Sequence, residues 1–267
     1  MLEGIVPGIS GPLAMVNTSE KGYVSFELLV EGMGGHSAMP PKQTVITTLT
    51  DAISRLQASP MPTHLFGPAS RLVEHLAPEA RFSQRMVLAN LWLFGPLVER
   101  EMSATPRLGS YLRTTLVTTM LEAGVKENVI PTRARAVVNS RVLPGDTVES
   151  VTEHVRAAIN DPRVQVRVLG TSNGPSPESP TDSLGYRAIE RTVRQVFPRA
   201  PVVPGMVVGA TDSRHFAVLT SSIYRFVPAT LGPQDLSRPH GTDERIATKD
   251  FATAVQFYAQ LIRNAAP

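Results

Sequence analysis

The sequence predicts a mixed fold of two parts, a complete α+β domain followed by a partial α/β domain. Strand, helix, strand, strand, helix and strand follow one another between residues 23 and 170, which resembles a ferredoxin-like layer of helices on a four-stranded sheet. Residues 171–183 are rich in serine, proline and glycine, as is typical of a linker. The segment after them alternates helices and strands but has too few strands for a doubly wound sheet.

Composition excludes several classes of protein. With 42% hydrophobic and 18% charged residues, the chain of 267 residues is typical of a globular protein. It has no apolar run of about 18 residues, so we expect no membrane partner. The net charge is only +3 and the basic residues are scattered, which argues against nucleic acid. The absence of cysteine excludes disulfides and zinc bound by thiolates.

The first residues, "MLEGIVPGIS", carry neither the basic start nor the long apolar segment of a secretory signal. We therefore expect a cytoplasmic protein. The same residues lack the pattern of an opening strand or a capped helix and are typical of the middle of a loop. They indicate a chain that begins late in its domain.

Patterns in the first part predict its elements in order. Residues 23–31 alternate apolar and polar side chains, which predicts a half-buried strand. Residues 42–57 repeat apolar side chains at three- and four-residue steps, which predicts a helix. Prolines divide residues 58–107 into short helices, which we interpret as an insertion without sites of its own. Further expected elements are strands at 111–121 and 133–143, a helix at 147–159 and a strand at 164–170.

The second part is shorter and less regular. We expect a helix at about 183–197, a strand at 201–208, a turn at 209–216, a strand at 221–228 and a final helix at about 247–263.

His240, in "RPHGTDERI", is the first candidate for chemistry. A histidine between proline and glycine is poorly placed for a packed core, so it is either a surface residue or a metal ligand. Zinc requires three or four donors. Asp243 and Glu244 lie nearby in sequence, but they fit equally well as caps of the following helix. No second histidine has a ligand-like setting, so the residues alone do not complete a metal site.

Other candidates also have two interpretations. His36, in "GGHS", is either an incidental turn residue or a donor to a developing oxyanion. Arg141 either pairs with a carboxylate on the sheet or grips a substrate carboxylate with two hydrogen bonds. Asn128, before "VIP", is typical of a turn. In "GATDSRHF", Thr211 or Asp212 is expected to cap a helix.

Together these motifs resemble one family. "SEKGYVSFELLVEGMGGHSAMPP", "NVIP", "NSRVLPGDT", "GATDSRHF" and "PHGTDERI" occur in the order seen in metallopeptidase family 20, the zinc aminoacylases and carboxypeptidases. The chain is most similar to the branch of carboxypeptidase S and the N-acyl-amino-acid hydrolases. The resemblance implies a zinc-peptidase catalytic domain with an inserted ferredoxin-like lid, or dimerisation, domain. It places the end of the first catalytic segment at 1–20, the lid at 21–172 with the helical insertion at about 58–110, and the C-terminal catalytic part at 173–267.

The resemblance also implies roles for individual residues. His240 matches a zinc ligand of a site that holds two zinc ions, and His36 matches a lid histidine that reaches the partner's site in a homodimer and stabilises the oxyanion. Asn128 matches a polar lid residue near the substrate, and Arg141 matches the arginine that binds the substrate's terminal carboxylate. A substrate-side loop corresponds to Thr211, Asp212 and Arg214.

One departure from the family pattern limits what this chain can do alone. The other zinc ligands of the family, a histidine, a bridging aspartate and two carboxylates, would lie before Met1, as would the glutamate that acts as general base. The resemblance therefore implies a zinc-dependent hydrolase of peptides or N-acyl amino acids with a free carboxylate, of which this chain alone is expected to be inactive. The alternative is a non-catalytic dimerisation module derived from the family.

Overall fold

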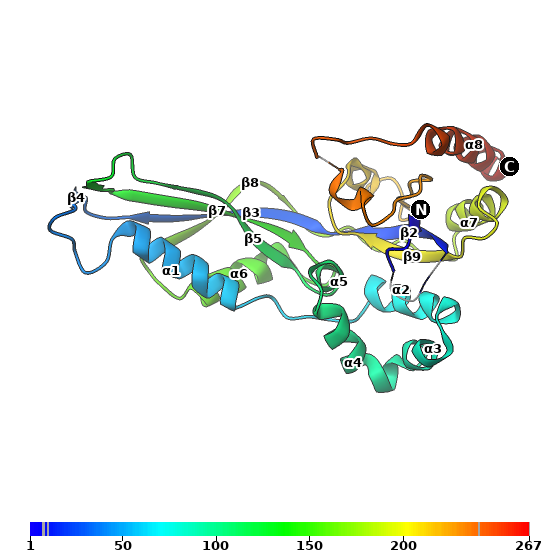
Figure 1. Ribbon diagram of the computed structural model, residues 1–267, viewed down its shortest axis with the longest axis horizontal. Coiled ribbons are helices and arrows are strands. Elements are labelled where there is room, and N and C mark those ends of the chain that lie inside the picture. Colours follow the sequence, from blue (N-terminus) through cyan, green and yellow to red (C-terminus); the bar gives the residue numbers. More distant parts are fainter. Residues whose placement is uncertain (7–8, 10, 240, 267) are drawn as a thin grey trace.

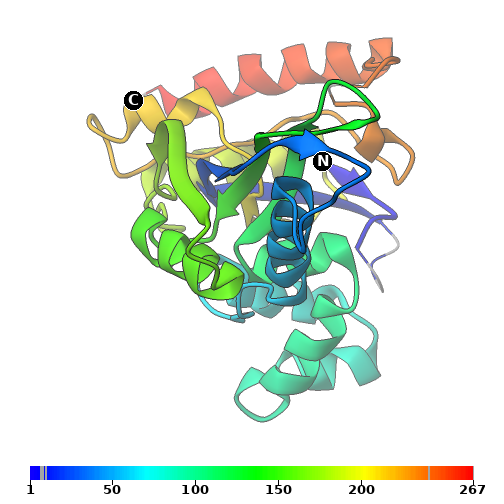
Figure 2. The same ribbon diagram turned by 90° about the vertical axis from the view of Figure 1, so that its left-hand side faces the viewer.

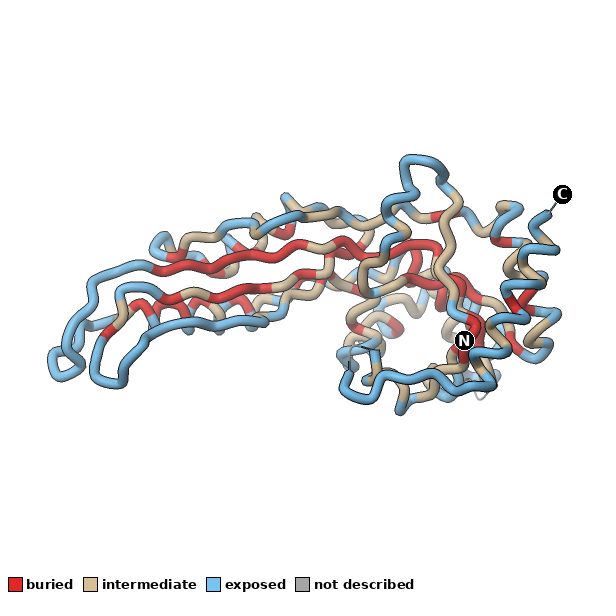
Figure 3. Tube along the Cα trace, turned by 90° about the horizontal axis from the view of Figure 1, so that it is seen from above, coloured by how far each residue is buried: buried red, intermediate tan, exposed pale blue. Residues whose placement is uncertain are grey.

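The computed structural model describes residues 1–6, 9, 11–239 and 241–266. The molecule is elongated, with a long sheet layer at one end and a smaller sheet wrapped by helices at the other (Figure 1). Figure 3 shows that burial follows the central strands of the long layer, whereas its outer tip is exposed.

The long layer is a four-stranded antiparallel sheet with two helices on one face. The order of its strands is β5-β7-β3-β8. This order and the two crossover helices are those of the ferredoxin-like fold, so the fold class predicted from the sequence is confirmed. The elements are β3 (Gly22–Glu31), α1 (Val45–Ala58), β5 (Thr115–Ala123), β7 (Arg133–Val142), α6 (Val148–Ile159) and β8 (Val164–Asn173).

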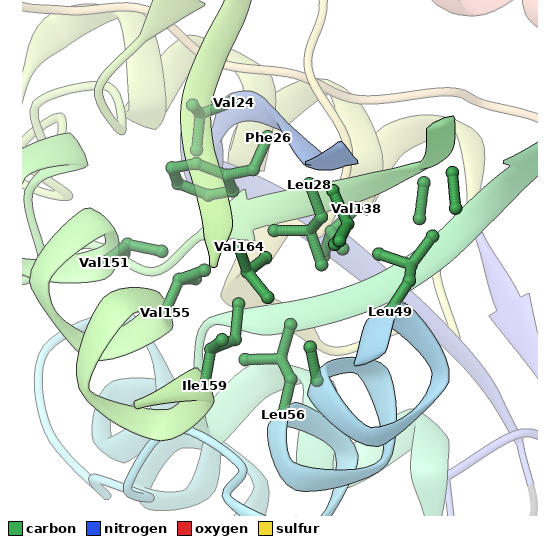
Figure 4. Packing of buried hydrophobic residues seen from close by; sticks show 14 of the residues in the cluster. Val24, Phe26, Leu28, Leu49, Leu56, Val138, Val151, Val155, Ile159 and Val164 are labelled. Atoms are coloured by element: carbon green, nitrogen blue, oxygen red, sulfur yellow. The ribbon is translucent and has the colours of Figure 1, made fainter. Parts of the chain in front are cut away.

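The core of this layer lies between the sheet and its helices. Alternate residues of β3, among them Phe26 and Leu28, point toward the apolar stripes of α1 and α6 (Figure 4). Leu49 and Leu56 of α1 and Val155 of α6 fill the space between them. Burial of these side chains is the main term that stabilises the layer.

The smaller sheet has the order β1-β2-β9, and its middle strand is parallel to β9. Its elements are β1 (Leu2–Glu3), β2 (Pro12–Glu20) and β9 (Val202–Val207). The expectation that the first residues hold no strand was wrong for β1, and β2 was not predicted. Because β2 is largely buried on both faces, its sequence lacks the alternation that marks a half-buried strand.

Helices cover both faces of the smaller sheet (Figures 1 and 2). On one face, α7 (Leu184–Val196) and α8 (Thr248–Ala265) pack on Ala14 through Val193 and Phe257. On the other, the helical insertion places Leu72 beside Leu13. The helices of the insertion are α2 (Pro68–Leu76), η1 (Ala77–Glu79), α3 (Phe82–Leu88), α4 (Leu91–Ser103) and α5 (Pro106–Leu112).

Three expectations about local structure need correction. The strand expected at 111–121 begins only at Thr115, because α5 continues to Leu112. No strand forms at 221–228, where Arg225 alone bridges to Asn17 of β2. The predicted linker begins inside β8 and then lies along β2, where the Ser179 N–H donates to the Thr18 carbonyl at 2.8 Å.

The remaining elements are short. They are β4 (Gly35–His36), β6 (Val129–Ile130), η2 (Asp212–Phe216) and η3 (Asp235–Ser237). Among the described helices, none is long and apolar enough to cross a membrane.

Candidate functional site

A cavity lies where the two parallel strands of the smaller sheet end. Because β2 and β9 run in the same direction, the residues after Glu20 and after Val207 meet at one edge. This edge of an α/β sheet is where ligands commonly bind. The cavity has a volume of about 410 Å³, and its lining includes Lys21, Tyr23, Asn173, Arg214 and His215.

Glu20 anchors the loop that carries the candidate residues of the second part. Its Oε2 accepts hydrogen bonds from the Thr211 N–H at 2.9 Å and the Thr211 hydroxyl at 2.6 Å. The Thr211 hydroxyl in turn accepts from the Ser213 N–H at 3.2 Å, so Thr211 caps η2, as one of the two expected caps. Asp212 begins η2 and is exposed. One buried carboxylate therefore fixes the start of this loop.

Arg225 completes the buried network. Its Nε lies 3.2 Å from Glu20 Oε2 and donates to the Ser213 hydroxyl at 2.7 Å. The side chains of Arg225 and Glu20 are only 8% and 2% exposed, so the two charges depend on each other for compensation. Burial lowers the pKa of the Arg225 guanidinium, and the charge of Glu20 partly offsets that change.

Lys21 is a second buried charge, between the two sheets. It is 1% exposed, and its Nζ donates to the Arg113 carbonyl at 2.6 Å. Burial lowers the pKa of Lys21 from 10.5 to about 8; the carboxylate of Asp146 opposes this shift and the cation of Arg141 adds to it. In the folded protein the ammonium therefore loses its proton near pH 8 instead of near pH 10.5.

This shift predicts a dependence of stability on pH. Between about pH 8 and 10.5 the unfolded chain holds the Lys21 proton more tightly than the folded chain does, so the unfolding free energy should rise with pH across that window. Below about pH 8 both states are protonated and the full penalty of burying the charge remains. Between about pH 7.5 and 9.5 the unfolding free energy of the unmodified protein should rise by about 1–2 kcal/mol more than that of Lys21→Met. Urea unfolding at each pH measures both.

The control for this prediction is Lys42→Met, at an exposed lysine, which should keep the pH dependence of the unmodified protein. If Lys21→Met showed the same pH dependence as the unmodified protein, Lys21 would not be the group responsible.

Arg141 lies next to this cavity. Its guanidinium carbon is 4.9 Å from the centre of the Tyr23 ring. Tyr23 and Arg214 both line the cavity. The structure thus brings Arg141 of the long layer and the loop of Thr211 to the same end of the molecule. We call this set, Arg141, Thr211, Asp212 and Arg214, the proximal group.

His36 and Asn128 form a second set, the distal group, at the exposed tip of the long layer. His36 pairs with Val129 between β4 and β6, and the Ser37 N–H donates to the Asn128 carbonyl at 3.2 Å. The Ala38 N–H donates to His36 Nδ1 at 3.1 Å. A ring nitrogen that accepts a hydrogen bond carries no proton, so in the neutral ring the proton is on Nε2, which becomes a donor.

The proximal and distal groups lie at opposite ends of β3 (Figure 1). Gly22 starts this strand beside the proximal group, and its last residue, Glu31, precedes the segment that carries His36. Within one chain, therefore, the distal group does not reach the cavity.

His240 lies outside the described residues. Its sequence neighbours Arg238 and Pro239 line a second cavity of about 570 Å³, together with Glu3 and Glu244. Asp243 forms an ion pair with Arg245. Among the residues that the structure describes, no three His, Cys, Asp or Glu side chains lie close enough to hold a metal ion.

Sequence reasoning missed the residues that support the proximal group. Glu20 and Lys21 are two charged residues directly after a run of buried residues. That pattern could have indicated that both side chains are buried. Arg225 sits between apolar residues in the segment 221–228, for which the sequence predicted only a strand.

The chain is similar to known proteins in sequence and in fold. A family profile described as a peptidase dimerisation domain matches residues 18–167. The chain is 46% identical to the N-fatty-acyl-amino acid synthase/hydrolase PM20D1 of Xenopus tropicalis, covering 99% of the chain and 52% of that protein. It is 38% identical to the probable carboxypeptidase S-like 2 of Dictyostelium discoideum, covering 99% and 51%. The chain thus spans about half the length of these curated relatives.

Solved structures show the same fold. An M20 family metallo-carboxypeptidase, Sso-CP2 from Sulfolobus solfataricus, matches with a TM-score of 0.65 at 15% identity, over 95% of this chain and 60% of its own. Human carnosine dipeptidase 1 matches with a TM-score of 0.63 at 14% identity, over 99% and 58%.

Proposed function

Since the chain belongs to the M20 peptidase family, we propose that the full-length protein hydrolyses the amide bond of N-acyl amino acids or peptides that end in a free carboxylate. The observation that carries the proposal is the proximal group. Arg214, in the loop fixed by Glu20, lines a cavity, and Arg141 lies against Tyr23, which lines the same cavity. The names of the relatives, a synthase/hydrolase of N-fatty-acyl amino acids and a probable carboxypeptidase, support this class of substrate.

The proximal group fits the recognition of a carboxylate. Arg214 lines the cavity, and Arg141 lies against a residue that lines it. A guanidinium binds a carboxylate with two parallel hydrogen bonds, and in a partly buried site such a pair gives specificity as well as affinity. We assign Arg141 to the terminal carboxylate of the substrate and the loop of Thr211, Asp212 and Arg214 to the substrate side of the cavity.

The distal group fits a role in the site of a second subunit. The match to a dimerisation domain supports a homodimer formed through the lid. In such a dimer the exposed tip of one subunit can reach the cavity of its partner. His36 would there present its Nε2–H to the oxygen of the amide carbonyl as negative charge develops on it, and Asn128 would contact the substrate beside it.

The described residues do not fit a complete metal site, so we derive no step through zinc. His240 stays a proposed ligand for one of two zinc ions in the full-length protein. Bound zinc would supply an activated water for attack on the amide carbonyl. The chain alone, without further ligands, is proposed to be inactive.

The test is a zinc measurement on the full-length protein, combined with hydrolysis of an N-acyl amino acid. Because loss of one donor from a set of three or four weakens the site, His240→Ala should release about one zinc ion per chain and abolish turnover. The control is His75→Ala, at an exposed histidine of α2, which should keep both. The same substrate with its carboxylate converted to an amide should be a poor substrate.

If the His240→Ala protein kept its zinc, His240 would not be a ligand. If the unmodified full-length protein bound no zinc and hydrolysed neither N-acyl amino acids nor peptides, the non-catalytic dimerisation module would be the better description. The cytoplasmic location expected from the sequence stays a prediction.

A further inference from the structure

A large apolar cavity lies between the helical insertion and the smaller sheet. Its volume is about 620 Å³, within the range of sites that bind small molecules. Leu72 of α2, Leu97 of α4 and Leu108 of α5 wall it on one side, and Leu2 and Met15 of the sheet wall it on the other. The sequence had suggested that the insertion holds no site of its own.

The chemistry of the wall fits an uncharged apolar group. Most of the lining side chains are aliphatic, and its ionisable side chains include one acid, Glu101, and one base, Arg107. These opposite charges cancel, so the wall has no excess of positive charge to attract an anionic headgroup. The phenol of Tyr111 is turned toward the thioether of Met15, at 3.7 Å, rather than toward a polar partner. A hydrocarbon chain fits such a wall, because its transfer from water is favourable for each methylene buried.

The position of the cavity connects it to the candidate site. Leu2 of β1 lines the apolar cavity, whereas the next residue, Glu3, lines the cavity beside Arg238 and Pro239, which precede His240 in the sequence. Successive side chains of a strand point to opposite faces, so β1 is a wall shared by the two cavities. A ligand whose reacting group lay in the cavity beside Arg238 and Pro239 would therefore have only β1 between it and the apolar cavity.

We propose that this cavity binds the hydrocarbon tail of a long-chain N-acyl amino acid. The inference rests on the proposed function, because it assigns the acyl group of the same substrate to a specific place in the fold. It makes the helical insertion the part of the protein that distinguishes long acyl chains from short ones. A substrate with a short acyl group would not extend into this cavity.

The decisive variant narrows the cavity without disturbing the packed core. Leu97 lines the cavity but is 46% exposed, so Leu97→Trp should be accommodated and should occupy part of the volume. Leu93, one turn earlier on α4, is 56% exposed and is not part of the lining, so Leu93→Trp is a matched control. In the full-length protein, Leu97→Trp should raise KM for an N-palmitoyl amino acid about tenfold, the effect of excluding two methylenes. KM for the N-acetyl counterpart should stay unchanged.

A binding measurement separates this inference from the proposed function. A fluorescent fatty acid should bind the full-length protein, be displaced by an N-palmitoyl amino acid, and bind about tenfold more weakly to Leu97→Trp than to Leu93→Trp. If the protein hydrolyses nothing but this difference in binding appears, the proposed function fails and the hydrocarbon site stands. If hydrolysis occurs but neither KM nor probe binding distinguishes the two variants, the hydrocarbon site is overturned.

A second variant covers the case in which Leu97→Trp does not fold. Leu97→Gln adds no bulk but places an amide in the cavity wall, and it should also weaken the long-chain ligand selectively. If the unmodified full-length protein bound no fluorescent fatty acid, the proposal would be wrong even if neither Leu97 variant folded.

Discussion

Glu20→Ala should lower the unfolding free energy of the protein by about 3–5 kcal/mol, the usual cost of removing one partner of a buried ion pair. The carboxylate is the acceptor for two hydrogen bonds from Thr211 and the counter-charge of Arg225. Its removal leaves the guanidinium of Arg225, whose side chain is only 8% exposed, without the carboxylate that compensates its charge. Urea unfolding of the variant and the unmodified protein measures the loss.

The network also predicts a functional effect that is separate from stability. Without Glu20 the loop that begins at Thr211 loses its anchor, so KM should rise in Glu20→Ala even at temperatures where the variant is folded. Glu20→Gln keeps an acceptor for Thr211 but loses the charge. Its KM should therefore return close to that of the unmodified protein, while its unfolding free energy should stay lower.

The matched control is Glu27→Ala. Glu27 of β3 also pairs with an arginine: its Oε1 lies 2.5 Å from Nε of Arg135. The side chain of Arg135 is 22% exposed, more than that of Arg225. Arg135 keeps a second carboxylate partner, Glu122 at 3.2 Å, so Glu27→Ala should lose less stability than Glu20→Ala and keep its KM. If Glu20→Ala lost no more stability than Glu27→Ala, the network around Glu20 would not be a major contribution to the unfolding free energy.

His36→Ala should lower the turnover number of the full-length dimer by about 100- to 1000-fold, the effect of losing one donor to a developing oxyanion. KM should change far less, because the hydrogen bond strengthens only as negative charge forms on the oxygen. Steady-state hydrolysis of an N-acyl amino acid gives both constants. Ser37→Ala, at the exposed neighbour, is the control and should behave like the unmodified protein.

Mixing two inactive variants tests whether His36 acts in the partner's site. In a dimer of one His36→Ala chain and one His240→Ala chain, one site would combine an intact His240 with an intact His36 from the other chain. If subunits exchange at random, about one quarter of the full activity should return. If His36 acted within its own chain, no site would be complete and no activity would return.

The sequence predicted the lid layer well because its strands and helices obey simple periods. The residues of β3 that face the helices alternate with polar ones, and α1 repeats its apolar residues at helical spacing. The smaller sheet was predicted less well. Strand β2 is largely buried on both faces, so it lacks the alternation of a half-buried strand. Residues 221–228 have the composition of a strand, but they pair with β2 only through the bridge between Arg225 and Asn17. Pairing of this kind depends on partners distant in the chain, which local patterns do not encode.

For the candidate site, the motifs identified residues but not how they are held. Thr211 was recognised as a possible cap, yet the carboxylate that binds it comes from a residue 191 positions earlier. The apolar cavity was missed for the same reason, because its walls join the insertion to β1 and β2 only in the folded protein.

Strand β2 of the smaller sheet continues almost directly into β3 of the long layer, so the angle between the two parts is set at one short connection. Only Lys21 separates the two strands, and Gly22 lies so close to Asn173 that an added Cβ would stand 2.5 Å from its carbonyl oxygen. The ten residues of β3 extend for about 33 Å, so a tilt of about 10° at this fulcrum would sweep its far end through about 6 Å. A small change of angle at Lys21 would thus become a large displacement of the tip that carries His36.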